Sequence, residues 1–375
     1  MIKLQQLTKV YDTPAGKVIA ADHIDLEVPS GEICVLLGPS GCGKTTTLKM
    51  VNRIVTPTSG KVLIDGEDTS NLPTVELRRK IGYVIQQIGL FPNMTVEENI
   101  CVVPRLLGWD VKVAHRRAAE LLELTALDPA IFLKRYPREL SGGQQQRIGV
   151  ARALAADPPV MLMDEPFGAI DPINRASIQD EFLKLQERLK KTILFVSHDI
   201  DEAVKMGDQI AIFRSGRLEQ CDTPDKVLAN PAQPFIADFL GTDRAIKRLG
   251  LIRVGDAMTN DAPVATLDVE VVRAQAMLRE SGAMALVVIT PEGKPSGFIT
   301  VTSSGANGNT CAEACTPIAA SISVNTDLRT AVSKMFEHDV EWLSCVDDQG
   351  RHVGTLEQWR IRQLLGRANS VGGLA

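Results

Sequence analysis

The chain has 375 residues, of which 44% are hydrophobic and 23% are charged, and its formal net charge is −5. This length is sufficient for two or three domains, and the hydrophobic content can fill a buried core. The acidic balance excludes an electrostatic argument for a nucleic-acid partner, which would favour a basic face.

The order of the residues excludes two further features. No run approaches the ~18 consecutive apolar residues of a membrane-spanning helix, and the start, MIKLQQLTKVYD, lacks the apolar run of a signal peptide. Any membrane role would therefore require a partner. The seven cysteines form no Cys-x-x-Cys pair. This pattern argues against a zinc site or a disulfide framework and favours a reducing cytosol.

Residues 1 to about 240 alternate short β-branched runs with helical stretches. The apolar runs are EICVLLG, PVMLMDE, TILFVSH and QIAIFRSG, each flanked by turn or helix signals. This alternation predicts an α/β fold in which helices cover both faces of a mostly parallel sheet. Between the first two runs lies a helix-rich insert at about 88–158, which contains the amphipathic stretch AHRRAAELLELTAL.

The first apolar run leads into the phosphate-binding loop GPSGCGKT and then into a helical stretch. Glycines let the backbone wrap around phosphates, and the start of the following helix adds a partial positive charge. Lys44 is expected to reach the β- and γ-phosphates of a nucleotide, and the Thr45 hydroxyl to coordinate Mg²⁺. We expect Cys42 to be a small filler residue rather than a regulatory thiol. The predicted nucleotide-binding residues in this segment are Gly38, Pro39, Ser40, Gly41, Cys42, Gly43, Lys44, Thr45 and Thr46.

The second apolar run ends in two acids, Asp164 and Glu165. A carboxylate at the end of a buried strand is costly without a compensating cation, so Asp164 is predicted to hold Mg²⁺ through water. Glu165 can polarise an attacking water molecule. The alternative is that both acids are solvated strand ends. His198 follows the third run, ILFVSHD; taken alone, such a histidine is more often a packing residue than a catalytic one.

A second Gly-rich loop, LSGGQQQR at Leu140–Arg147, lies about 100 residues after the first. The Ser141 hydroxyl and the amides of Gly142 and Gly143 would form an anion-binding corner at the start of the next helix. With the phosphate-binding loop and the paired acids, this octapeptide resembles the ATPase subunits of ABC transporters. The resemblance implies the P-loop ATPase fold, with a helical subdomain and antiparallel N-terminal strands.

The resemblance also implies an assembly and a catalytic pair. In that family the corner, here Ser141, Gly142, Gly143 and Gln144, closes on the γ-phosphate that a second subunit holds. It therefore implies a head-to-tail homodimer with two ATP molecules at the interface. It further implies that His198 contacts the γ-phosphate and orients Glu165, which makes these two residues the catalytic pair.

Three more positions match the family. Gln86, in VIQQIGL, would sense the γ-phosphate and contact Mg²⁺ and the membrane partner, and Gln87 is the alternative register. Asp171, in FGAIDP, would communicate between the two sites. Tyr11, ahead of the first strands, would stack on adenine, with Val18 on the same face; the alternative is an accidental tyrosine. The implied metal ligands are Thr45, Gln86 and Asp164, and the implied cofactors are ATP and Mg²⁺.

From Gly241 the composition changes. A basic stretch, DRAIKRLGLIRVG, leads to two segments that repeat each other at an offset of 57 residues, the first from Ala265 and the second from Ile322. Each copy reads as helix, strand, tight turn and strand, with a glycine in the turns PEGK and DDQGR. The pattern is similar to a tandem CBS-domain pair, and chance repetition is the alternative.

These observations predict the following domains. The ATPase domain spans 1–240 with its helical subdomain at about 88–158, the linker spans 241–254, the CBS domains span 255–306 and 307–367, and a flexible tail spans 368–375.

Three functions compete: the ATPase subunit of an importer, a soluble ABC ATPase, and an exporter subunit. Soluble members usually carry two cassettes or a long coiled coil, and exporters are often fused to membrane helices; neither feature is present. The stretch GLFPNMTVEENI resembles importer subunits that dock a helix of a separate permease. We therefore favour an importer, with the chain bound peripherally at the cytoplasmic face of the cell membrane.

A cassette in which EPFGAIDPINR directly follows the apolar run VMLMD, with two CBS repeats after the cassette, resembles the ATP-binding subunits of glycine betaine, carnitine and choline uptake systems. Those systems import compatible solutes under osmotic stress. The resemblance implies that the permease and an extracytoplasmic binding protein recognise the solute. The alternative is the ATPase subunit of another amino-acid or small-solute importer, or, less compatibly, a non-transport ABC ATPase.

In that family the CBS pair tunes activity through ionic strength or an adenine nucleotide. Adenosine-binding repeats end in a pattern with Ser or Thr and then Asp or Asn. The first copy has Thr300 but Ser303 in the acid's place, and the second has Glu357 and Arg360 at the two positions. Both ribose sites are therefore degraded, and we expect a dimerisation or ionic-strength module.

Overall fold

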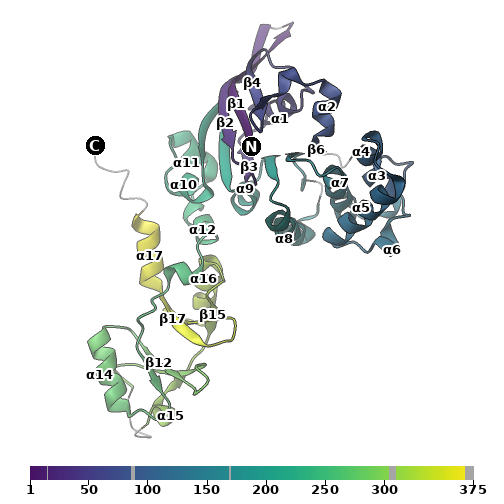
Figure 1. Cartoon of the computed structure of the whole chain (residues 1–375). Helices are drawn as coiled ribbons and strands as arrows, with labels where there is room; N and C mark the ends of the chain where they lie inside the picture. The colour runs from purple at the N-terminus through teal and green to yellow at the C-terminus, as the bar shows by residue number, and fades with distance from the viewer. Residues whose placement is uncertain (15, 86–88, 169, 304–309, 368–375) are drawn as a thin grey trace. The chain divides into compact units, whose positions relative to one another are not determined.

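The computed structural model describes residues 1–14, 16–85, 89–168, 170–303 and 310–367. The chain divides near residue 240 into two compact units (Figure 1). The first holds residues 1–227 and 231–239, and the second holds residues 228–230 and the chain from 240 onward. Within the described ranges, no helix has the length and apolar character needed to cross a bilayer.

The first unit begins with an antiparallel sheet of strand order β2-β1-β4-β5. A long hairpin dominates it, because β1 and β2 pair over most of their length. Ile2, Leu4 and Ile24 point from this hairpin into the core and are fully or almost fully buried. The strands are β1 (Ile2–Thr13), β2 (Gly16–Val28), β4 (Ser59–Ile64) and β5 (Glu67–Asp68).

The second sheet has six strands in the order β10-β9-β3-β8-β7-β6. Its neighbours are parallel except for the edge pair β10 and β9, which confirms the mostly parallel sheet. Every residue of β3, β7 and β8 is buried, as strands covered on both faces require. The strands are β3 (Ile33–Leu37), β6 (Ile81–Val84), β7 (Val160–Asp164), β8 (Thr192–Val196), β9 (Gln209–Arg214) and β10 (Arg217–Asp222).

Helices connect the parallel strands. α1 packs against β7 and β8, and α9 packs against β3. Because the carboxyl ends of parallel strands meet at one edge of a sheet, the residues that follow β3, β7 and β8 lie together. The helices of this part are α1 (Lys44–Val51), η1 (Thr69–Asn71), α2 (Thr74–Arg79), α8 (Pro172–Leu189), α9 (Ile200–Met206), α10 (Pro224–Ala229) and α11 (Pro234–Leu240).

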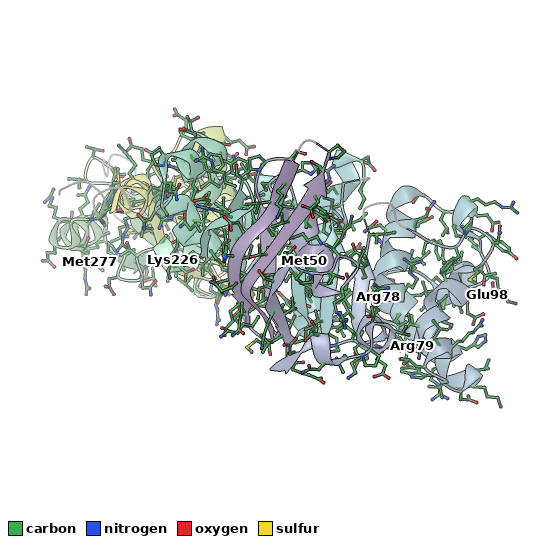
Figure 2. The ribbon with its side chains drawn as sticks, turned by 90° about the horizontal axis from the view of Figure 1, so that it is seen from above. Met50, Arg78, Arg79, Glu98, Lys226 and Met277 are labelled. Atoms are coloured by element: carbon green, nitrogen blue, oxygen red, sulfur yellow. The ribbon has the colours of Figure 1, made fainter. Side chains whose placement is uncertain are left out.

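The predicted helix-rich insert forms a helical subdomain, in which α7 packs against α3, α5 and β6. Buried Asn99 donates hydrogen bonds from its side-chain amide to the carbonyls of Phe91 and Met94, and this fixes the loop before α3. Figure 2 labels Arg78 and Arg79 of α2 beside this subdomain and Glu98 within it. Its helices are α3 (Val96–Ile100), α4 (Val102–Leu106), α5 (Val111–Leu124), α6 (Pro129–Phe132), η2 (Pro137–Glu139) and α7 (Gly142–Leu154).

The second unit contains the 57-residue repeat, and both copies adopt the same order of elements at that offset. The turn glycines Gly293 and Gly350 have φ of 79° and 76°, a conformation that favours glycine. The repetition is therefore structural and not accidental. The first copy has β11 (Val264–Thr266), α14 (Val271–Ser281), β12 (Leu286–Ile289) and β13 (Pro295–Ile299); the second has β15 (Ser321–Ser323), α16 (Leu328–Glu337), β16 (Trp342–Val346), β17 (His352–Glu357) and α17 (Gln358–Arg367).

The two copies exchange their N-terminal helices. α13 (Val254–Ala257) packs into the core of the second copy, and α15 (Cys311–Ala314) packs into the core of the first. A short strand after α15, β14 (Thr316–Pro317), pairs with β13. A Cβ on Gly354 would lie 2.4 Å from the Thr259 carbonyl oxygen, so the crossing chain requires glycine there. The boundaries expected at 255–306 and 307–367 therefore cut across two shared cores.

The stretch expected as a linker, 241–254, is also part of this unit. It contains α12 (Arg244–Leu249), and Leu249 and Val254 are buried in the second core. The expected flexible tail, 368–375, lies outside the described residues.

Candidate functional site

The loop between β3 and α1 is shaped by glycines in a left-handed conformation. Gly43, the N-cap of α1, has φ of 103°, and a Cβ there would lie 2.1 Å from the carbonyl oxygen of Ala20 in β2. A Cβ on Gly38 would lie 2.3 Å from the carbonyl oxygen of Phe213 in β9. Both neighbours are backbone atoms that cannot move aside, so only glycine permits this loop.

Lys44 is buried, and its ammonium lies inside the loop. The Nζ atom donates hydrogen bonds to the carbonyl oxygens of Gly38 at 2.6 Å and Pro39 at 2.9 Å. It also lies 3.6 Å from Sγ of Cys42, which is itself buried. The loop thus holds one cation and a set of backbone N–H groups at the start of a helix, which is an arrangement suited to bind phosphates.

Thr45 and Asp164 come together although they lie far apart in the sequence. The Thr45 hydroxyl donates to Oδ1 of Asp164 at 3.0 Å. Burial raises the pKa of Asp164 above its ordinary value, and the hydrogen bond from Thr45 and the charge of Lys49 oppose that rise. No group of three or more His, Cys, Asp or Glu residues within the described ranges could hold a metal. One hydroxyl and one carboxylate would suit Mg²⁺, a cation that proteins hold through few oxygen ligands of their own.

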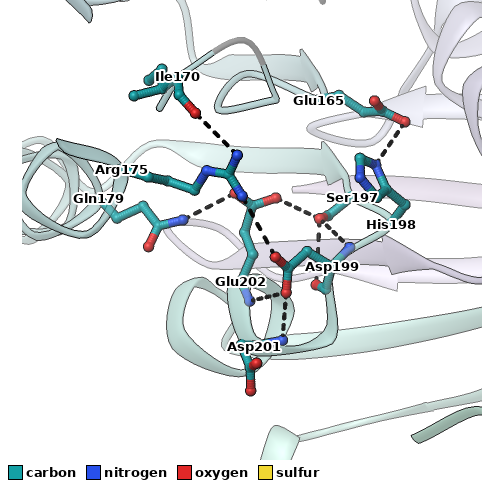
Figure 3. Close-up of polar contacts among 9 residues, drawn as sticks. All are labelled: Glu165, Ile170, Arg175, Gln179, Ser197, His198, Asp199, Asp201 and Glu202. Atoms are coloured by element: carbon teal, nitrogen blue, oxygen red, sulfur yellow. Dashed lines mark hydrogen bonds and ion pairs between the residues drawn. The ribbon is translucent and has the colours of Figure 1, made fainter. Parts of the chain in front are cut away.

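Glu165 and His198 face each other across the ends of β7 and β8, and Figure 3 shows the contact. Nδ1 of His198 lies 3.3 Å from Oε1 of Glu165. The backbone N–H of Glu165 donates to the carbonyl of Val196, which fixes the end of β7 against β8. Both side chains line a pocket of about 380 Å³ together with Ser40–Thr46 and Ala20.

This pocket unites the predicted phosphate-binding loop with the predicted catalytic pair. It also contains a residue that sequence reasoning missed: Ala20 reaches the loop from the hairpin strand β2, and an alanine within a strand carries no sequence signal. Tyr11 is not among the described residues that line this pocket. Tyr11 lies within β1, not ahead of the first strands as expected, and pairs there with Val18; both side chains are exposed.

The second Gly-rich loop caps α7. The Ser141 hydroxyl accepts from the Gln144 N–H at 3.3 Å, and Oε1 of Gln144 accepts from the Ser141 N–H at 3.0 Å. These two bonds form a capping box that orders the corner. Ser141–Gln144 line a second pocket, of about 520 Å³, and Asp171 lines the same pocket.

Within one chain the two loops do not meet, since the described residues that line the two pockets differ. Gln86 and its alternative Gln87 lie outside the described residues. The fold and the first pocket define a P-loop nucleotide-binding protein, in which Ser141–Gln144 line a separate pocket.

Comparisons with known proteins agree with that class. The family model of the ABC transporter matches residues 21–168. The osmoprotectant import ATP-binding protein OsmV of Salmonella typhimurium is 52% identical, covering 97% of this chain and 96% of that protein. The glycine betaine/carnitine/choline transport ATP-binding protein OpuCA of Bacillus subtilis is 45% identical, covering 94% and 93%. The chain therefore belongs to the family of ABC transporter ATP-binding subunits that contains these import proteins.

A solved structure supports the fold of the first unit. The dimeric bacterial ABC transporter cassette MJ0796 is 37% identical, with a TM-score of 0.54, and the match covers 60% of this chain and 98% of that one. The predicted ABC ATPase fold and the predicted importer resemblance are thus both confirmed. The comparisons favour neither a soluble ABC ATPase nor an exporter subunit.

Proposed function

We propose that the chain is the ATP-hydrolysing subunit of an importer for quaternary amines such as glycine betaine, carnitine and choline. The proposal rests on two observations together: the residues that line the first pocket and the family to which the chain belongs. The pocket holds a phosphate-binding loop beside the Glu165–His198 pair. The family is that of relatives named for import of these solutes, at 52% and 45% identity over nearly the whole chain.

ATP hydrolysis is assigned to residues of the first pocket. The backbone N–H groups of residues 41–46 and the Lys44 ammonium bind and neutralise the phosphates. Glu165 accepts a proton from the attacking water, and His198 holds Glu165 in place through its 3.3 Å contact. Phosphoryl transfer needs little covalent help from the protein, so positioning and charge supply most of the catalysis. We assign adenine stacking to Tyr11, whose ring is partly exposed on β1.

Thr45 and Asp164 are the proposed Mg²⁺ ligands in the described part of the chain, and Gln86 is a proposed third. The 3.0 Å contact between the Thr45 hydroxyl and the Asp164 carboxylate supports this assignment. A bound Mg²⁺ would neutralise charge on the β- and γ-phosphates.

A homodimer would complete each site. The Ser141–Gln144 corner and the Lys44 loop line different pockets of one chain. The corner would therefore contact the phosphate of a nucleotide that is bound by the phosphate-binding loop of another subunit. The dimeric cassette structure supports such an assembly. We propose a head-to-tail dimer in which Asp171, beside the corner, communicates between the two sites.

Permease docking is assigned to a groove of about 320 Å³ between β6 and the helical subdomain. Arg78, Arg79, Tyr83, Phe91 and Arg152 line it, and Phe91 is 46% exposed. Guanidinium groups beside aromatic rings suit a short amphipathic helix of a membrane partner. This assignment places the chain peripherally at the cytoplasmic face of the membrane. Solute recognition then belongs to the permease and to an extracytoplasmic binding protein.

Transport tests the proposed function directly. The chain, assembled with its permease in liposomes that enclose ATP and Mg²⁺, should import labelled glycine betaine, choline or carnitine from outside in the presence of the binding protein. ADP in place of ATP provides the control. Import of another amino acid or small solute, and of none of these three quaternary amines, would support the alternative small-solute importer. ATP hydrolysis without uptake of any solute would support a non-transport ATPase.

The repeat region is proposed to regulate transport as an ionic-strength or dimerisation module. The four positions of the expected ribose pattern already have partners inside the unit. Oγ of Ser303 accepts from the Thr300 N–H at 2.9 Å, and Nε1 of Trp359 donates to Glu357 at 2.5 Å. Arg360 donates to the Thr259 hydroxyl. This internal bonding supports a role other than tight binding of an adenine nucleotide.

Salt activation tests the regulatory proposal. In liposomes with anionic lipid, Lys247→Gln should shift the KCl concentration for half-maximal ATPase activity by about two-fold, because Lys247 belongs to the basic stretch DRAIKRLGLIRVG and salt screens the attraction between such charges and an anionic membrane. Lys226→Gln is the matched control: both lysines pair with an aspartate four residues earlier, at 2.6 Å and 3.2 Å. Identical curves for the two variants would contradict the proposal. A shift produced by micromolar adenine nucleotide would instead support ligand sensing.

A further inference from the structure

Behind the Glu165–His198 contact lies a buried carboxylate, Glu202, that the hydrolytic scheme does not use. It lies on α9, one turn after the His198 loop, and is 8% exposed. A carboxylate is seldom buried this deeply without hydrogen-bond partners. Burial raises the pKa of Glu202 above its ordinary value, and hydrogen bonds from Ser197 and Gln179 oppose the rise.

Each oxygen of Glu202 receives one hydrogen bond, and the two donors come from different elements (Figure 3). The Ser197 hydroxyl donates to Oε2 at 2.5 Å, from the loop after β8. The Gln179 amide donates to Oε1 at 3.0 Å, from α8. Ser197 and Gln179 are 1% and 5% exposed, so water cannot replace Glu202 as their partner without reorganisation.

On one side this network fixes the loop that carries His198. Oγ of Ser197 also accepts from the backbone N–H of Asp199 at 3.0 Å, so both sequence neighbours of His198 are held. Asp199 in turn caps α9 by accepting from the N–H groups of Asp201 and Glu202. His198 itself is largely exposed. Its position against Glu165 therefore depends on the residues on either side of it.

On the other side the network reaches the loop that carries Asp171. Gln179 lies on α8, the helix that begins directly after Asp171. Arg175, one turn earlier on the same helix, donates to the carbonyl of Ile170 at 3.0 Å and lies 3.8 Å from the Asp199 carboxylate. Two parallel links, one hydrogen-bonded and one ionic, thus join the Asp171 loop to the His198 loop.

We infer that Glu202 is a positioning residue for hydrolysis: it holds His198 against Glu165 and joins that pair to the Asp171 loop through α8. The inference rests on the proposed ATPase function and deepens it. If Asp171 responds to the second subunit, Glu202 and Gln179 transmit that response to the catalytic pair. The proposed relay runs from the Asp171 loop through α8 to Glu202, and from Glu202 through Ser197 to His198.

The test uses the full-length chain and the single variants Ser197→Ala and Gln179→Ala. Each removes one donor to Glu202 and leaves Glu165, His198 and the phosphate-binding loop unchanged. We expect kcat to fall about 10-fold or more, since a small misplacement of a catalytic group has effects of this size. The KM for ATP should stay within about two-fold of the wild-type value, because no phosphate contact is lost.

Gln186→Ala is the matched control. Gln186 is also a buried amide on α8, two turns after Gln179, but its bonds go to the backbone of Gly31 and Lys191 at the opposite end of β8. The Gln186→Ala variant should have a lower midpoint temperature of unfolding than the wild type but the same kcat. Glu202→Gln should restore most of the activity that Glu202→Ala loses, because an amide can accept from Gln179 and donate to Ser197.

The double variant Ser197→Ala/Gln179→Ala separates a relay from two independent defects. If both residues act through Glu202, the fold-decrease of kcat in the double variant will be smaller than the product of the fold-decreases in the two single variants. Three results would overturn the inference: unchanged kcat in both single variants, multiplicative losses, or an equal loss of kcat in Gln186→Ala. Absence of ATP turnover in the wild-type protein would overturn the proposed function and the inference together.

Discussion

Replacing Glu165 by glutamine should reduce ATP turnover by about 10²- to 10⁴-fold, the range in which a general base contributes. Glutamine has the same shape but cannot accept a proton from water. The contacts of the phosphate-binding loop remain, so ATP should still bind. Because the corner at Ser141 can close but cannot be released by hydrolysis, we expect an ATP-stabilised dimer. Phosphate release and gel filtration with and without ATP measure these two effects.

Glu97→Gln is the control for this substitution. Glu97 also contacts a histidine, His115, but in the helical subdomain away from the pocket. It should leave turnover within about two-fold of the wild type, since surface ion pairs contribute little. Wild-type turnover in the Glu165→Gln variant would reject Glu165 as the base. Loss of turnover without an ATP-dependent dimer would reject the assembly that the corner implies.

The second large effect is expected from Gly43→Ala. The φ of 103° at Gly43 disfavours any side chain, and the new Cβ would lie 2.1 Å from the Ala20 carbonyl oxygen. Relief requires movement of the loop or of β2. Strain and overpacking of this kind cost about 1–3 kcal/mol each. ATP affinity should therefore fall about 100-fold, since each 1.4 kcal/mol changes a binding constant about tenfold.

Gly66→Ala separates the clash from the backbone strain. Gly66 has φ of 83°, but a Cβ there has no neighbour within 4 Å. It lies in the turn between β4 and β5, outside the pocket. This variant should lose some thermal stability and keep its affinity for a fluorescent ATP analogue. Equal affinities of Gly43→Ala and the wild type would show that the loop adapts to the added carbon.

Much of the fold and site could be predicted because the signals are local. Three buried runs of β-branched and apolar residues predicted β3, β7 and β8, and the segments that follow these strands contain Lys44, Glu165 and His198. Since these strands are parallel neighbours, their carboxyl ends converge at one edge of the sheet. The sequence therefore indicated both the chemistry of these residues and their proximity.

Other features depend on contacts that no spacing reveals. Ala20 reaches the phosphate-binding loop from a strand whose alanine has no distinctive pattern. Glu202 looks like one acid among several near the start of a helix, and only the packing of α8 on the His198 loop identifies its two donors. Tyr11 was expected ahead of the strands but lies within β1, because the hairpin extends further than its apolar residues suggest.

The C-terminal unit shows the same division. The 57-residue offset predicted two copies with the same elements, because periodic apolar positions and turn glycines are encoded within each copy. The exchange of α13 and α15 between the copies was not predictable in this way. A four-residue helix has too little apolar surface to specify which of two similar cores will bury it, so the choice is made by the tertiary fold.

By itself the sequence determined the family, the phosphate-binding loop, the paired acids and the internal repeat, because these depend on residue types at short spacing. Only the tertiary structure decided which distant residues meet. It placed Asp171 beside the Ser141 corner, separated that corner from Lys44, and buried Glu202 between Ser197 and Gln179. The physical reason is that hydrogen bonds and steric contacts act over a few ångströms in space, at any separation along the chain.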